Sequence, residues 1–314
     1  MRGGRAKVSA LAAALLILTL TSGGSGPPSS APVPLTFALA GDLSLARGVA
    51  QALAGQWNAA LDGVYPVLKA AATLGNLESP LTLAPRRTAG IDLRADPAAA
   101  VALHGFTHLN TQNNHAQDGG AAGQTESGAT LRRWGIQPVS SGLTVSRVRG
   151  VPVAWIGFFD DGHTPPPLKA VQDGAKRARV VVVAVHWGAE FNPVTARQRL
   201  LAGQFAAAGA TLIVGSGPHV LQRAERIATP HGSTLVLYSL GNLLFDQTFP
   251  AARVGAVVRV RWIPATTRRP ELEACAVPTR VRAGRVTLAP ADEAARVLTR
   301  LNLPACGGAA GGRE

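Results

Sequence analysis

The chain has 314 residues, of which 46% are hydrophobic, and its formal net charge is +13 at pH 7. That length and apolar content can build one large domain or two small ones. The positive charge favours anionic partners such as acidic polymers, phosphates or lipid headgroups. Because the chain shows neither a basic helix nor aromatic residues interleaved with its arginines, the composition argues against nucleic acid as a partner.

The first residues have the layout of an export signal. Basic residues among the first seven precede an apolar run at 8–20, and small residues follow at 21–26. The apolar run is shorter than the roughly 20 residues that span a bilayer comfortably, and no cysteine follows it for lipid attachment. We therefore expect residues 1–22 to be a cleaved signal peptide, with an uncleaved N-terminal anchor as the alternative. Either form predicts export, to the periplasm or the outer face of the cytoplasmic membrane.

The composition also predicts where folding begins and ends. Residues 23–34 are rich in Gly, Pro and Ser and read as a flexible linker. One folded domain is expected at 35–305, followed by a disordered Gly/Ala tail at 306–314. Cys275 and Cys306 are the only cysteines. Because two cysteines in an exported protein most often pair, we predict a structural disulfide between them.

Apolar runs alternate with amphipathic segments along the predicted domain. Strands are expected, in chain order, at 35–40, 74–77, 105–110, 137–139, 143–149, 152–158, 180–185, 212–214, 234–238 and 255–262. Helical patterns lie at 50–61, 64–72, 96–103, 123–134, 168–177, 195–208 and 291–301, with Asp96 as an expected N-cap. Continuous apolar strands separated by helices indicate sheets covered on both faces. We expect a layered α/β protein in which two sheets pack between helices.

Five polar clusters follow predicted strands at the points where those strands end. In α/β sheets, ligands bind outside the carboxyl ends of the strands, so these clusters are expected to share one site. Their chemistry-bearing members are Asp42, Asn76 with Glu78, Asn113 with Asn114, His115 and Asp118, His186 with Trp187 and Glu190, and Ser216 with His219.

The residue types in these clusters suit a divalent cation. Asp42 and Glu78 supply anionic oxygens, Asn114 supplies an amide oxygen, and His186 and His219 supply imidazole nitrogens. Mixed oxygen and nitrogen ligands without sulfur suit Mn, Fe, Zn or Mg, in a number that the residues leave open.

Two further residues are candidates for chemistry on the substrate. His115, next to a predicted ligand, could protonate a leaving oxygen or stabilise a developing oxyanion. Arg47 could bind an anionic group of the substrate. Asn76, Asn113, Asp118, Trp187, Glu190 and Ser216 are expected to line the same site.

Each cluster taken alone has an ordinary explanation. A Gly-Asp pair at Asp42 is typical of a turn, and Glu78 before Ser-Pro can cap the next segment. Asn114 can bond to its own loop, and His186 can be a satisfied core histidine. Taken singly, Asp42 and Glu78 favour these explanations, whereas the five clusters together favour a shared site.

The order of the blocks resembles the CapA (poly-γ-glutamate synthesis) family, which has the calcineurin-like metallophosphatase fold. The resemblance implies a four-layer α-β-β-α sandwich. It implies that Asp42, Glu78, Asn114, His186 and His219 are metal ligands, that His115 acts on the substrate, and that Tyr238 and Asn242 belong to the site wall. It further implies export and a role in making, exporting or attaching an anionic poly-γ-glutamate capsule, with membrane capsule-synthesis subunits as further partners. The matching blocks are 41–47, 75–80, 105–118, 186–190, 215–220 and 238–245.

Two positions depart from the family pattern. Family members commonly carry a histidine near Ser216 or Gly217, and the general phosphatase pattern Gly-Asp-x-His has a histidine where Ser44 stands. A two-metal site would therefore be short of ligands. The sequence leaves open a capsule protein with a metal pocket, an exported metal-dependent phosphoesterase, and a metal-poor pseudoenzyme that binds anionic polymer.

Overall fold

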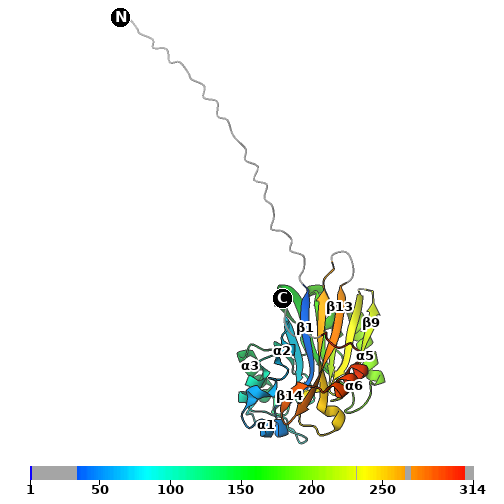
Figure 1. The fold of residues 1–314 in the computed structure, drawn as a ribbon. Helices are drawn as coiled ribbons and strands as arrows, with labels where there is room; N and C mark the ends of the chain where they lie inside the picture. Colours follow the sequence, from blue (N-terminus) through cyan, green and yellow to red (C-terminus); the bar gives the residue numbers. More distant parts are fainter. Residues whose placement is uncertain (2–33, 231, 266–269, 308–314) are drawn as a thin grey trace. The chain divides into compact units, whose positions relative to one another are not determined.

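The domain consists of two β-sheets with helices on their outer faces (Figure 1). The predicted signal or anchor and nearly all of the predicted linker and tail lie outside the described residues. Among the residues described, no helix has both the length and the apolar character that crossing a bilayer requires. The computed structural model describes residues 1, 34–230, 232–265 and 270–307.

The larger sheet joins the first strand of the domain to its last ones. Its strands are β1 (Leu35–Leu43), β2 (Ala72–Leu77), β3 (His108–Asn110), β4 (Gln137–Val139), β11 (Asn242–Leu244), β12 (Val254–Ile263), β13 (Glu271–Arg282) and β14 (Arg285–Leu288). The order is β14-β13-β12-β1-β2-β3-β4, with β11 paired to the end of β1. β1, blue in Figure 1, lies between β12, to which it is antiparallel, and β2, to which it is parallel. The C-terminal strands therefore continue the sheet on one side of β1.

The smaller sheet has a parallel centre and antiparallel edges. Its strands are β5 (Thr144–Val148), β6 (Val151–Phe159), β7 (Val180–His186), β8 (Leu212–Ser216), β9 (Leu221–Thr229) and β10 (Gly232–Leu240). In the order β5-β6-β7-β8-β10-β9, the four central strands run parallel. Their carboxyl ends therefore meet at one edge of the sheet, where a site can form.

The helices divide between the two outer faces. On the larger sheet lie α1 (Arg47–Leu53), α2 (Tyr65–Leu68), α3 (Gly120–Arg133) and the 3₁₀ turns η1 (Trp57–Ala60) and η2 (Pro97–Leu103). On the smaller sheet lie α4 (Leu168–Arg177) and α5 (Ala196–Ala208). The short η3 (Pro250–Arg253) precedes β12, and α6 (Ala291–Leu301) packs against β9 and β13.

Alternating side chains of the strands fill the spaces between these layers. Phe37 on β1 points into the core between the sheets, whereas its neighbour Ala38 faces the helices on the larger sheet. On β7, Val182 points between the sheets, and Val181 and Val183 pack against α4 and α5. This period of two is the geometry of a strand buried on both faces. The predicted four-layer sandwich is confirmed.

Three predicted helices differ from the structure. The helix expected at 50–61 begins earlier, at Arg47, and ends at Leu53 because Ala54 adopts a left-handed conformation with a φ of 45°. The helix expected at 64–72 is a single turn, because Ala72 already pairs with Phe37 in the sheet. The segment at 96–103 is a 3₁₀ helix, with Asp96 accepting from the backbone N–H of Ala98 as its N-cap.

The sequence analysis also missed β9, β11, β13 and β14. β9 is an edge strand whose charged residues, such as Arg223 and Glu225, alternate with buried ones, so it lacks the apolar run of the central strands. β11 has three residues and gains its pairing only from the end of β1. Cys275 and Cys306 form the predicted disulfide, and the backbone N–H of Cys306 donates to Ala276, so this residue is tied to β13.

Candidate metal centre

Four buried titratable side chains converge where the strands end. Asp42 is the last residue but one of β1, Glu78 follows β2, His186 ends β7 and His219 lies in the loop after β8. All four are at most 5% exposed. His219 Nδ1 lies 3.4 Å from Asp42 Oδ2, and His186 Nδ1 lies 3.8 Å from Glu78 Oε1. The fold therefore brings together four of the five predicted ligands.

Three of these residues form a set that can hold a divalent cation. Asp42, Glu78 and His219 each offer one ligand atom, and these atoms all lie within 4.8 Å of one another. Glu78 Oε2 is buried and has no hydrogen-bond partner among the described residues. The nearest cationic group is His219, whose Nε2 lies 3.9 Å from Glu78 Oε2, beyond hydrogen-bond distance. A buried carboxylate oxygen without a hydrogen bond is costly, and a cation bound between these groups would satisfy it. Two oxygens and one nitrogen therefore fit a bound cation.

The pKa values of the three residues are shifted by burial and by their charges on one another. Burial and the charge of Asp42 raise the pKa of Glu78 well above its ordinary value. Burial would also raise the pKa of Asp42, but its hydrogen bond and attraction to His219 lower that pKa to about 2. Burial opposes the charge on His219, yet the carboxylates of Glu78 and Asp42 raise the pKa of His219 to about 10. A cation bound here competes with protons on Glu78 and His219.

Asn76 orients the cluster through its side-chain amide. Its Nδ2 donates to Asp42 Oδ1 at 2.8 Å and to His186 Nδ1 at 3.2 Å. Its Oδ1 accepts from Asn110 Nδ2 at 2.9 Å, which settles the orientation of the amide. His186 Nδ1 is therefore the acceptor nitrogen, and its lone pair faces the cluster. The sequence analysis missed Asn110, although it ends a predicted strand.

Burial keeps His186 neutral. It lowers the pKa of His186 to about 4, against the attraction of Asp42, and the charges of His219 and His115 act in the same direction as burial. Ser216 Oγ lies 3.3 Å from His186 Nδ1 and belongs to the same network. A neutral imidazole can accept the hydrogen bond from Asn76, and it is also the form that can bind a metal ion in place of that bond.

The two neighbouring asparagines of the loop after β3 differ in burial. Asn113 is buried, donates to the backbone carbonyl of Leu77 at 2.8 Å and accepts from the backbone N–H of His115. Asn114 is exposed, and its side chain makes no hydrogen bond to any described residue. Ala116 closes a turn back to the carbonyl of Asn113 in this loop. The buried amides beside the cluster are thus Asn76 and Asn113, whereas Asn114 is an exposed residue of the same loop.

His115 and Asp118 form a carboxylate–imidazole pair in the same loop. His115 Nδ1 donates to Asp118 Oδ2 at 2.9 Å, and that oxygen also accepts from the backbone N–H of Leu93. Because Asp118 holds the proton on Nδ1, Nε2 is the nitrogen of His115 that can exchange a proton. The charge of His115 reaches His186, so the pair lies within electrostatic range of the centre.

Arg47 forms an ion pair with Asp246, a residue that the sequence analysis missed. Its Nη2 donates to Asp246, and its guanidinium lies 5.8 Å from the centroid of the Phe245 ring. Asp246 also accepts from the backbone N–H of Gly48. The ring of Phe245 lies 4.9 Å from that of His219, so Arg47 sits one ring away from the centre. In the sequence, Asp246 directly follows the block 238–245 that resembles the family. This position was the one feature that could have indicated Asp246.

The two departures from the family pattern have structural consequences. Gly217 has a φ of 106°, and a Cβ there would lie 2.8 Å from the backbone oxygen of Trp187, so a side chain requires a local shift. Its backbone N–H donates instead to Asp42 Oδ2 at 3.1 Å. Ser44 Oγ bonds to Ser79 Oγ at 3.0 Å. Neither position supplies a ligand for a second ion.

The remaining predicted site residues take three positions. Asn242 contacts the centre, with Oδ1 2.9 Å from His219 Nδ1. Trp187 and Tyr238 are packed in the core on the helical face of the smaller sheet, where Trp187 Nε1 donates to the carbonyl of Tyr238. Glu190 is exposed, and its charge adds to the rise in the pKa of Glu78.

The rim of the centre carries two exposed aromatic rings. Phe191 and Phe249 are 42% and 50% exposed, and their ring centroids lie 5.2 Å apart. Phe191 has a φ of 59° and His219 a φ of 58°, which is unusual for bulky residues. Such strained backbone is concentrated at functional sites.

The comparison with protein families decides the relationship. The sequence model described as "Bacterial capsule synthesis protein PGA_cap" matches residues 36–154 and 159–247, about two thirds of the chain. The chain belongs to the PGA_cap family. The matched ranges contain Asp42, Glu78 and His219, so the PGA_cap region includes the whole candidate metal set.

Two relatives of this PGA_cap chain carry the CapA name. The PGA biosynthesis protein CapA of Bacillus subtilis (strain 168) is 32% identical over 228 residues, which cover 62% of this chain and 59% of the relative. The capsule biosynthesis protein CapA of Bacillus anthracis is 29% identical over 264 residues, covering 72% and 63%. The matched part of the chain thus spans about three fifths of each relative's length. The predicted resemblance to CapA is confirmed.

A solved structure shares the fold of this PGA_cap chain. It is described as a novel phosphatase from Mycoplasma pneumoniae, and it aligns with a TM-score of 0.50 and 11% identity over 80% of this chain and 96% of its own. At that identity the likeness concerns the fold alone. The metallophosphatase-type fold predicted from the motifs is confirmed.

Proposed function

We propose that this protein uses a bound metal ion to act on an anionic capsule polymer such as poly-γ-glutamate, in its synthesis, export or attachment. The carrying observation is the buried set Asp42, Glu78 and His219 with the unpartnered Oε2 of Glu78. Membership of the PGA_cap family supports the capsule context. The names of the two relatives, which concern PGA and capsule biosynthesis, support the class of polymer.

The residues of the centre have separable roles in this proposal. Asp42, Glu78 and His219 would hold the cation, which supplies Lewis-acid polarisation of a substrate oxygen when bound. His186 is neutral and lies beside this set, where its Nδ1 accepts from Asn76. His115, oriented by Asp118, holds or releases a proton at Nε2 for a leaving or attacking oxygen or nitrogen. Imidazole beside carboxylate favours Zn, Mn or Fe over Mg.

The first test is the metal content of protein purified without chelator. We expect about one equivalent of Zn, Mn or Fe per chain, because one three-residue set is formed among the described residues. About two equivalents would show that ligands outside this set complete a second site. No bound metal, with no uptake on reconstitution, would contradict the proposal.

The second test compares two classes of substrate. The metal-loaded protein is incubated with a γ-linked glutamate oligomer and with a generic phosphate monoester. We expect the oligomer to be shortened or transferred, and His115→Ala to abolish this while His163→Ala, an exposed histidine, does not. Turnover of the phosphate ester alone would favour the exported phosphoesterase instead.

A polymer-binding pseudoenzyme is the second candidate. It is favoured by Gly217 and Ser44, which supply no ligand where family and fold patterns have histidine. It predicts salt-sensitive binding of the γ-glutamate oligomer without any change in the oligomer's length. Metal retention together with turnover would exclude it.

We also propose that the protein is exported and works with membrane-bound capsule-synthesis subunits. The basic, apolar and small segments of residues 1–26 support export, and the disulfide between Cys275 and Cys306 fits an oxidising compartment. A reporter that is active only outside the cytoplasm, fused after residue 34, should be active. N-terminal sequencing of the mature protein then separates a cleaved signal from a retained anchor, and an inactive reporter contradicts export.

A further inference from the structure

A cavity lined by arginines shares Phe245 with the surroundings of the metal centre. It has a volume of about 600 Å³ and lies between the start of α1, the loop after β11, η3 and the turn from β13 to β14. We call it the arginine pocket; Phe245, Asp246, Gln247, Arg253, Arg280 and Arg282 are among the residues that line it.

The arginine pocket carries positive charge that nearby acids do not balance. Asp246 is engaged by Arg47, and Arg280 donates to Glu293 at 2.9 Å. Arg253 and Arg282 are exposed, and neither guanidinium has an ion pair or side-chain hydrogen bond to a described residue. Two free guanidiniums at one cavity present donors suited to bidentate binding of anionic groups.

The wall between this pocket and the metal centre is shared. Phe245 lines the pocket, and its ring lies 4.9 Å from that of His219. Gln247 lines the pocket and accepts from Asn242, whose Oδ1 lies 2.9 Å from His219 Nδ1. Asn242 also donates to the carbonyl of Ala252, the residue before Arg253. One layer of side chains thus separates the free arginines from the proposed metal ligands.

We propose that the arginine pocket is the subsite that holds carboxylates of an acidic polymer next to the repeat positioned at the metal centre. The inference rests on the proposed function, in that it takes the metal centre as the reacting end. A polymer with one carboxylate per repeat presents anionic groups on both sides of any bond that reaches the centre. Arg253 and Arg282 bind these groups and set the register of the chain, whereas Arg280 is held by Glu293.

The test measures binding separately from turnover. A fluorescently labelled γ-linked glutamate decamer is titrated into the full-length, metal-loaded protein, and its anisotropy is followed at two salt concentrations. The double variant Arg253→Gln/Arg282→Gln is expected to bind about tenfold more weakly and with a shallower salt dependence. Arg253→Lys/Arg282→Lys, which keeps the charge but loses the fork geometry, should fall between this variant and the wild type.

A matched control removes the same charge elsewhere. Arg132→Gln/Arg177→Gln changes two exposed arginines on α3 and α4 that do not line the pocket, and it should weaken binding less than about twofold. Equal losses in both double variants would reduce the effect to net charge and overturn the subsite. Tighter binding of inorganic polyphosphate of equal charge would overturn the carboxylate assignment.

The two proposals fail in different ways. If the arginine pocket is not the subsite, the pocket variant binds the decamer like the wild type, while metal content and turnover remain as expected. If the proposed function is wrong, metal or turnover is missing, while the pocket variant still loses decamer binding. Measured metal content of each variant, expected to equal that of the wild type, shows that the centre is intact.

Discussion

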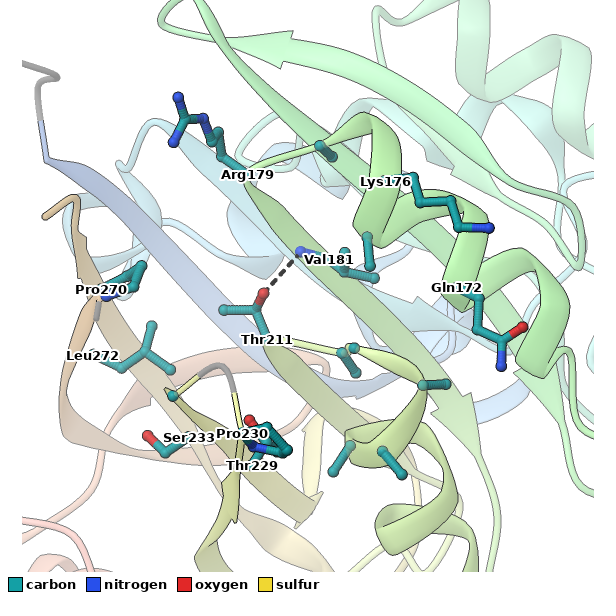
Figure 2. A pocket seen from close by; sticks show the side chains of 18 of the residues that line it. Gln172, Lys176, Arg179, Val181, Thr211, Thr229, Pro230, Ser233, Pro270 and Leu272 are labelled. Atoms are coloured by element: carbon teal, nitrogen blue, oxygen red, sulfur yellow. Dashed lines mark hydrogen bonds between the residues drawn. The ribbon is translucent and has the colours of Figure 1, made fainter. Parts of the chain in front are cut away.

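The two ends of the smaller sheet carry very different groups of side chains. At the carboxyl ends of β7 and β8, His186 and Ser216 belong to the metal centre. Near the amino ends, where Val181 and Thr211 lie, a cavity of about 500 Å³ opens (Figure 2). In Figure 2 the hydroxyl of Thr211 accepts from the backbone N–H of Val181. This hydroxyl therefore links the start of β7 to the residue before β8.

The contrast lies in the kinds of side chain found at the two ends. The cavity at the amino end has charged side chains, Lys176 and Arg179, that are exposed at its edge. Among its described lining residues, one side-chain polar atom, Nε1 of Trp262, is buried without a partner. Its other walls include the alanines Ala175, Ala178, Ala206, Ala207, Ala208 and Ala210. Converging buried titratable groups, and not volume, distinguish the site with chemistry.

The largest effect is expected from Glu78→Gln, which keeps the size of the side chain and removes its charge. Mutating a residue that only hydrogen-bonds to a metal ligand typically lowers metal affinity 10- to 100-fold. Because Glu78 is a proposed ligand itself, metal affinity should fall by more than this. Stability without metal should change by less than about 1 kcal/mol, because the raised pKa of Glu78 already favours its neutral form. Competition with a chelator dye and urea unfolding measure the two quantities. Retained metal affinity would remove Glu78 from the ligand set.

A smaller loss is expected from His186→Ala. The variant removes the imidazole that accepts from Asn76 beside the centre but leaves the Asp42, Glu78 and His219 set in place, so metal affinity should fall about 10- to 100-fold. Metal analysis after dialysis measures this loss, with His163→Ala as the control. Unchanged metal content would show that His186 is a core histidine that happens to lie beside the centre.

His108 sharpens the comparison, because it is a buried imidazole without a carboxylate partner. It stacks on Trp155 with ring centroids 3.8 Å apart, and burial lowers its pKa to about 4. The unfolded chain, with a histidine pKa near 6.5, therefore binds more protons between pH 6.5 and 4. This contribution to stability is present above about pH 6.5 and is lost as the pH falls toward 4.

The measurement for His108 is urea unfolding at pH 7.5 and 5.0. The free energy of unfolding of the wild type should fall between pH 7.5 and 5.0, and titration of His108 accounts for about 2 kcal/mol of that fall. The fall should be smaller by this amount in His108→Phe, which keeps a ring against Trp155. His186 titrates in the same direction and remains in both proteins. An identical pH dependence in the two proteins would contradict the assignment.

The smallest effect is expected at the other end of the sheet. Gln172→Ala/Lys176→Ala changes two exposed residues that line the cavity of Figure 2. Stability should change by less than about 0.5 kcal/mol, because surface substitutions of this kind remove little packing. Metal content and decamer binding should equal those of the wild type. A loss of either would break the contrast drawn between the two ends.

Much of the layered fold followed from local pattern. The apolar run at 180–185 is β7 apart from its last residue, and the pattern at 168–177 matches α4. The edge strand β9 could not be predicted in this way, because its charged residues alternate with residues buried only by neighbouring elements. The one-turn α2 was overpredicted, since pairing of Ala72 with Phe37 begins the next strand early. Long-range pairing overrode local helix preference there.

The candidate site was predictable in composition but not in detail. Residue types at strand ends indicated Asp42, Glu78, His186 and His219, because parallel strands bring their carboxyl ends together. Nothing local separated Asn113 from Asn114, since the buried amide of Asn113 donates to Leu77 in another segment of the chain. Asp246 was missed because its partners, Arg47 and the backbone of Gly48, lie about 200 positions away in the chain.

The sequence by itself determined the layers, the family and the kinds of ligand, because periodicity and ordered motifs are properties of the chain. Tertiary structure alone decided that Glu78 Oε2 has no hydrogen-bond partner among the described residues, that Gly217 gives Asp42 a backbone donor, and that two free arginines lie one layer of side chains from His219. These facts depend on distances between segments far apart in the chain, and such distances are set only when the two sheets pack together.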